Sequence, residues 1–292
     1  MTEYRDKCAL HLEHYAAKHG LPIGGDHKGN GKEYGHILKV SRYLSPKGTK
    51  ELNKDEQYEK IVSYNLLENV SPDLYKKKEA HSMAHYLTSS QVLCYNFFRA
   101  LMDEEAHPLQ GLIDLLGQHG IAISRSALCE FEYNPPFYGK DGRRESSEID
   151  FHINDSDGTE VFFEIKYTEH EFGKWERPKE SNYKNFYEPM IAQCKGLYSE
   201  RIAYNDSFKA DYQLYRNALR VKSKDIYTVF LYPRGNAELE GQYQRFKSMI
   251  KMENNIQVWY WEDIVSKEQF PLLYEKYFET YPEEISHHRS RR

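Results

Sequence analysis

Residues 148–167 read EIDFHINDSDGTEVFFEIKY, and this stretch decides the expected fold. Apolar side chains alternate with others on both sides of NDSDG, which has the composition of a turn. Gly158 in this turn can adopt a positive φ at little cost. The pattern predicts two antiparallel strands joined by a five-residue turn, with Asn154 paired to Glu160.

Counting back along both strands from that pair sets Asp150 opposite Glu164, with Lys166 on the same face. Two carboxylates at about 4 Å repel each other by about 4 kcal/mol when the effective dielectric is near 20. A hard divalent cation relieves the repulsion, because Mg²⁺ takes carboxylate oxygens, water and phosphate as ligands. The alternative is a solvated sheet face that carries only a cross-strand Asp/Lys pair.

Composition sets broad limits on the protein. The chain has 292 residues and a net charge of −5, which neither requires nor excludes a nucleic-acid partner. We find no run of 18 apolar residues, and the N-terminus is charged where a signal peptide would be apolar. A soluble, cytoplasmic protein with no membrane partner is expected. The four cysteines show no CxxC spacing and are interpreted as reduced, mostly buried thiols.

The order of elements predicts an α/β (α+β) fold with a mixed sheet. Helical patterns over residues 88–102 and 107–120 precede three strand patterns around ALCEFEY, EIDFHI and EVFFEIKY. A helix over residues 207–221, a strand IYTVFLY and a further strand IQVWYW follow. Consecutive strands imply an antiparallel meander, and the intervening helix implies a crossover. Residues 1–85 are interpreted as a mainly helical or irregular extension of unknown role, and 86–292 as the main domain.

The strings EID and FFEIK resemble the motif of the PD-(D/E)xK nuclease superfamily, with Asp150 at its aspartate and Glu164, Ile165 and Lys166 at its (D/E)xK. The resemblance covers roughly residues 88–232, and it implies a restriction-endonuclease-like αβββαβ core flanked by helices. EIKYTEHEFG and TSSQVLCYNFF look like a bacterial restriction-endonuclease-like branch. One departure is Ile149, which stands where the family often has proline.

The resemblance implies that Asp150, Glu164 and the Ile165 carbonyl bind Mg²⁺, with Mn²⁺ as a substitute. Lys166 would orient or deprotonate the attacking water. The implied function is a DNA endonuclease of a restriction or other defence pathway, with RNA the less favoured substrate. Because restriction-type cutting of duplex DNA usually needs two active sites, a homodimer is the expected assembly.

Supporting residues are weighed against plain structural roles. Gln213, Arg216, Asn217 and Arg220 share one face of the predicted helix, where Gln213 would lie near the metal and the arginines would hold phosphates, or where all four are simply solvated. Glu148 is the best candidate for an additional carboxylate, ahead of Glu130 and Glu132. Arg143 and Arg144 would contact the DNA backbone, unless GKDGRRESS is only a polar turn. His81 and His85 are interpreted as surface histidines.

Two further function classes are considered beside the nuclease. A catalytically silent DNA-binding or partner module on the same fold would bind DNA in a salt-sensitive way without cleavage. An acid–base hydrolase with paired carboxylates, such as a glycosidase, would need no divalent ion. The presence of Asp150, Glu164 and Lys166 together favours the metal-dependent nuclease.

Overall fold

The computed structural model describes residues 3–26, 33–38, 64–68, 70, 83–102, 109–175, 179–194, 202–251 and 255–279. Its contacts divide the chain into two compact units. The first unit combines Met1–Leu67, Ala80–Ser89 and Val265–Arg292, and the second combines Glu68–Glu79 with Ser90–Ile264. These contacts group the C-terminal segment with the N-terminal one, whereas the sequence analysis placed 86–292 in one domain. The functional division of the chain into residues 1–85 and 86–292 stays a prediction.

The first unit holds a helix, a strand pair and a C-terminal helix. Helix α1 (Glu3–Lys18) buries Cys8, Leu12 and Ala16, which recur every fourth residue along one stripe. Strands β1 (Ile23–Asp26) and β2 (Glu33–Leu38) pair antiparallel, and helix α11 is Pro271–Tyr277. Residues 1–85 were expected to be mainly helical or irregular, so the β1–β2 strand pair is a finding of the structure.

The second unit is built around a five-stranded sheet with the order β3-β4-β5-β6-β7. The strands are β3 (Leu128–Tyr133), β4 (Ile149–Asn154), β5 (Glu160–Ile165), β6 (Ile226–Tyr232) and β7 (Ile256–Tyr260). β3, β4 and β5 are antiparallel neighbours, whereas β5 with β6 and β6 with β7 are parallel pairs. This mixed sheet with flanking helices confirms the predicted fold class.

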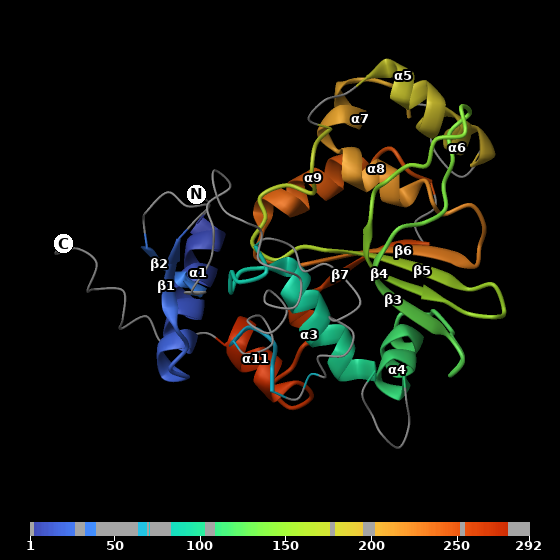
Figure 1. Ribbon diagram of the computed structural model, residues 1–292. Coiled ribbons are helices and arrows are strands. Elements are labelled where there is room, and N and C mark those ends of the chain that lie inside the picture. Colours follow the sequence, from blue (N-terminus) through green and yellow to red (C-terminus); the bar gives the residue numbers. More distant parts are fainter. Residues whose placement is uncertain are drawn as a thin grey trace. The chain divides into compact units, whose positions relative to one another are not determined.

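Helices α3 (Ser90–Met102) and α4 (Gln110–Gln118) lie on one face of the sheet (Figure 1). Phe98 of α3 stacks on Phe151 of β4 with ring centroids 3.9 Å apart and meets Phe163 of β5 edge-on at 4.9 Å. Because Phe151 and Phe163 are cross-strand partners, α3 packs across both strands of the central hairpin. Helix α3 therefore covers one face of the hairpin, and different helices cover the opposite face.

Helices α8 (Tyr212–Ala218) and α9 (Ala237–Lys247) lie on the opposite face (Figure 1). There Phe230 of β6 packs against Phe246 of α9, with ring centroids 6.0 Å apart. Phe230 is also the register partner of Glu164 in β5, so its side chain shares a sheet face with Glu164. The helices that follow the hairpin in sequence therefore cover the face from which Glu164 projects.

The single helix predicted over residues 207–221 is two helices, α7 (Asp206–Ala210) and α8, separated at Asp211. The carbonyls of Lys209 and Ala210, which a continuous helix would bond internally, accept hydrogen bonds from other segments. The donors are the Trp175 amide at 2.8 Å and the Gln242 side chain at 3.2 Å. These tertiary bonds end α7 and let α8 begin in a new direction.

Helix α9 was not predicted, and it forms the crossover that makes β7 parallel to β6. Asn236 caps its N-terminus, with the side-chain oxygen accepting from the Leu239 amide. The remaining short helices are α5 (Glu180–Asn182), the π-helix η2 (Tyr183–Tyr187), α6 (Glu188–Gln193) and α10 (Trp261–Ile264). Among the described helices, none is both long and apolar enough to cross a membrane.

Candidate active site on the β4–β5 hairpin

The register of the hairpin is the predicted one. Asn154 pairs with Glu160 and Phe151 with Phe163, where the pairing of β4 with β5 ends. Counting one position further along each strand places Asp150 opposite Glu164, and Asp150 accepts a hydrogen bond from the adjacent Ile165 amide. The turn closes through a hydrogen bond from the Asp155 amide to the Thr159 carbonyl, and Gly158 takes a φ of 96°. An L-residue rarely adopts that angle, which explains the glycine.

The two carboxylate oxygens of Asp150 differ in their hydrogen bonding. Its Oδ2 accepts a hydrogen bond of 2.6 Å from the Ile165 amide, and no hydrogen bond from the described residues reaches Oδ1. Burial raises the pKa of Asp150 well above its usual range, and repulsion from Glu164 adds to the rise, while Lys166 opposes it. The predicted conflict between two close carboxylates is therefore present in the fold.

Lys166 lies beside Glu164 on the same strand end. Its Nζ donates a 2.6 Å hydrogen bond to Oε1 of Glu164, and both side chains are largely buried. Burial lowers the pKa of Lys166, but the attraction of Glu164, Asp150 and Glu169 outweighs it and raises the pKa to about 12. Among the protein's own groups, the carboxylates therefore outweigh desolvation in setting the pKa of Lys166.

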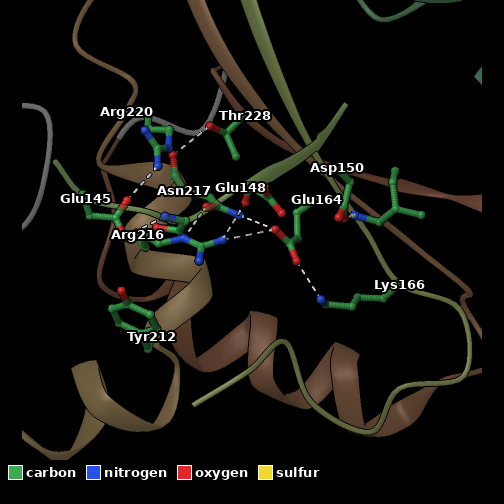
Figure 2. A network of polar contacts seen from close by, with 12 residues as sticks. Glu145, Glu148, Asp150, Glu164, Lys166, Tyr212, Arg216, Asn217, Arg220 and Thr228 are labelled. Carbon is green, nitrogen blue, oxygen red and sulfur yellow. Dashed lines mark hydrogen bonds and ion pairs between the residues drawn. The ribbon is translucent and has the colours of Figure 1, made fainter. Parts of the chain in front are cut away.

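Helix α8 brings two more donors to the other oxygen of Glu164. Nδ2 of Asn217 donates to Oε2 at 2.6 Å, and a guanidinium nitrogen of Arg216 lies 3.6 Å from the same oxygen. Figure 2 shows Lys166 reaching Glu164 from one side and this pair from the other. The buried carboxylate is thus bonded to the protein at both oxygens.

A family model described as Restriction Endonuclease associating with ARP (REase-ARP) matches residues 10–281, which is most of the chain. The chain belongs to the REase-ARP family. No curated protein and no solved structure matches it. Membership supports a restriction-endonuclease-like family and a nuclease-like role, with DNA as the suggested substrate.

In this REase-ARP protein the predicted arginine face of α8 is buried. The exposed fractions are 7% for Arg216, 1% for Asn217 and 6% for Arg220, so the interpretation as a solvated face is wrong for these three. The periodicity correctly grouped them, but their partners come from the β4–β5 hairpin and from the loop before it. Arg220 forms an ion pair with Glu145 at 3.5 Å, and its guanidinium lies over the ring face of Phe162. Phosphate binding by Arg216 or Arg220 stays a prediction and would require the DNA to reach buried groups.

The predicted supporting residues have mixed placements. The Oε1 atom of Gln213 is buried and finds no hydrogen-bond partner among the described residues. The side chain of Glu148 is exposed, and its carbonyl accepts from Arg216 at 3.5 Å. Arg143 and Arg144 are exposed; Arg143 pairs with Asp141 at 2.6 Å, and Arg144 donates to the Asn134 carbonyl. The roles proposed for these four residues stay predictions.

Glu132 rather than Glu148 is the acid that the structure brings into electrostatic reach of Asp150. Its φ of 49° is unusual for a non-glycine residue in a strand, and its carboxylate accepts from Gln91 of α3 at 3.0 Å. Its charge contributes to the raised pKa of Asp150. From the sequence Glu132 ranked behind Glu148, because strand alternation alone does not reveal the unusual φ of Glu132 or its bond to Gln91.

Two smaller predictions complete the comparison. His85 is buried and packs edge-on against Tyr86, so its interpretation as a surface histidine is wrong, and His81 lies outside the described residues. All four cysteines are free, and Cys8, Cys94 and Cys194 are buried as predicted. Within the described part of the chain, no three His, Cys, Asp or Glu side chains cluster as a ready metal centre. A cation at the hairpin would therefore rely on two carboxylates.

Proposed function

We propose that this REase-ARP protein is a Mg²⁺-dependent nuclease of the PD-(D/E)xK type that hydrolyses phosphodiester bonds of DNA in a restriction or other defence pathway. The observation that carries the proposal is the hairpin register, which sets Asp150 opposite Glu164 while Lys166 bonds to Glu164. Family membership adds the nuclease-like role. Action in the cytoplasm, a homodimer and the association with ARP that the family description names belong to the same proposal.

The residues present fit a hard divalent cation. Asp150 has an oxygen that accepts no hydrogen bond from the described residues, and burial together with the charge of Glu164 raises its pKa. Carboxylate and carbonyl oxygens are the ligands that Mg²⁺ prefers. Asp150, Glu164 and the Ile165 carbonyl would hold Mg²⁺ or, as a substitute, Mn²⁺.

Lys166, Arg143 and Arg144 would act beside the metal in hydrolysis and in DNA binding. When bound, the metal would supply an acidified water and offset charge at the scissile phosphate. Lys166 would orient the attacking water and stabilise the negative charge of the pentacovalent phosphate. Arg143 and Arg144, both exposed, would contact the DNA backbone.

The test is a cleavage assay on duplex DNA, single-stranded DNA and RNA with Mg²⁺, Mn²⁺ or EDTA. We expect cleavage of DNA that requires the metal and that is lost in Asp150→Ala and Lys166→Ala. Lys224→Ala is the matched control, because that lysine is exposed on the turn before β6. Full cleavage by folded Asp150→Ala and Lys166→Ala proteins would rule out the proposed site.

One observation favours the second candidate, a catalytically silent DNA-binding or partner module. Both oxygens of Glu164 are already bonded to protein donors, as expected of a site that has become purely structural. This candidate predicts salt-sensitive DNA binding with no cleavage under any divalent ion. Measuring binding and cleavage on the same DNA separates the two functions.

A further inference from the structure

We propose that Asn217 is a positioning residue that fixes the direction of the Glu164 carboxylate for metal binding. The proposal rests on the proposed function and adds to it a residue from outside the hairpin. Asn217 and Glu164 are 53 residues apart in the chain, and both are almost completely buried. Their hydrogen bond of 2.6 Å is therefore shielded from competing water.

The orientation of the Asn217 amide is set by its other contacts. Its Oδ1 accepts a hydrogen bond of 3.0 Å from Nε of Arg216, which leaves Nδ2 to face Glu164. Rotating the amide by half a turn would place oxygen against a carboxylate and nitrogen against a guanidinium, so only one orientation satisfies both neighbours. Arg216 thus holds the donor of Asn217 in place.

The backbone at Asn217 is also fixed to the sheet. The Thr228 hydroxyl of β6 donates to the Asn217 carbonyl at 3.0 Å, and Thr228 shares the sheet face of Glu164. Figure 2 shows the chain of contacts from Thr228 through Asn217 to Glu164. A rigid strand therefore sets the position of the amide relative to the carboxylate.

A neutral donor suits this position for an electrostatic reason. Lys166 already balances one negative charge of the Asp150 and Glu164 pair. Arg216 is already a second cation beside Glu164, so a third cation at the position of Asn217 would make this group of side chains more positive and oppose the binding of a divalent ion. An amide fixes the direction of Glu164 and leaves its charge intact. Groups that orient metal ligands in this way commonly change metal affinity 10- to 100-fold when removed.

The experiment is calorimetric titration of Mn²⁺ into the full-length protein, below the melting temperature of every variant. We expect Asn217→Ala to bind Mn²⁺ about 10- to 100-fold more weakly than the unmodified protein. Asn255→Ala is the matched control, because it makes the same substitution at a buried asparagine whose side chain bonds the Lys224 and Ile226 carbonyls rather than a residue of the site. It should lower the melting temperature with Mn²⁺ affinity changed by less than about threefold.

The outcomes separate this inference from the proposed function. Asp150-dependent Mn²⁺ binding that Asn217→Ala leaves unchanged would overturn only the role of Asn217. Equal losses of affinity in Asn217→Ala and Asn255→Ala would also overturn it, because a general loss of packing would then explain both. If the unmodified protein binds no Mn²⁺ at Asp150, the proposed function and this inference fail together.

Discussion

Replacing Asp150 by asparagine should make the protein more stable while it abolishes the proposed activity. Asparagine keeps an oxygen that can accept from the Ile165 amide, as Oδ2 of Asp150 does at 2.6 Å. It removes the charge that stands opposite Glu164 and leaves the bond between Lys166 and Glu164 in place. The substitution therefore isolates the electrostatic cost of the second carboxylate.

The expected gain follows from the opposing charges. Repulsion between two carboxylates about 4 Å apart is about 4 kcal/mol at an effective dielectric near 20, and attraction to Lys166 cancels part of it. A net gain of about 2 kcal/mol in the free energy of unfolding is expected at pH 7.5.

The stability gained in Asp150→Asn should increase as the pH rises. The pKa of Asp150 is higher in the folded protein than its ordinary value of 3.8, so the folded state binds this proton more tightly. The cost of Asp150 is absent below the unfolded pKa and grows as the pH rises from there toward the folded pKa. Asparagine does not titrate, so the stability difference should be small near pH 4 and should grow as the pH rises toward neutral.

The assay is urea unfolding in EDTA at several pH values between 4 and 7.5. Asp225→Asn is the matched control, because it removes one negative charge from an exposed position. A variant Asp150→Asn that is no more stable than the unmodified protein at pH 7.5 would refute the reasoning. So would a gain that is the same at pH 4 and at pH 7.5.

Three further predictions concern packing, a buried lysine and DNA contact. Phe98→Ala should lower the free energy of unfolding by about 3–5 kcal/mol in urea titrations, because Phe98 is fully buried against Phe151 and Phe163; a loss under about 1 kcal/mol contradicts this. Burial lowers the pKa of Lys276 from 10.5 to about 7, so stability should rise by about 1.4 kcal/mol per unit between pH 7 and 9.5, and Lys276→Met should flatten that rise. Only the unfolded state binds the Lys276 proton in that pH range. An equal slope of stability against pH in both proteins would contradict the lowered pKa of Lys276. The double substitution of Arg143 and Arg144 by alanine should weaken DNA binding in fluorescence titrations and reduce the slope against log salt by about 2; an unchanged slope would remove both from the interface.

Local sequence patterns were enough to predict the hairpin and its two opposed acids. Side chains alternate along a strand, and a turn of fixed length sets the register, so the pairing of Asn154 with Glu160 could be counted out to Asp150 and Glu164. The mixed sheet followed from the order of strand and helix patterns. These features depend on neighbours in the chain, which is why local patterns were sufficient.

The residues that contact Glu164 from outside the hairpin could not be predicted in this way. Helical spacing grouped Arg216, Asn217 and Arg220, but spacing does not say which surface a helix covers. That choice came from the break at Asp211 and from the packing of α8 on the sheet, where the Thr228 hydroxyl bonds to Asn217. Contacts across 53 residues, such as the one between Asn217 and Glu164, arise when a whole face is buried, and no local pattern encodes them.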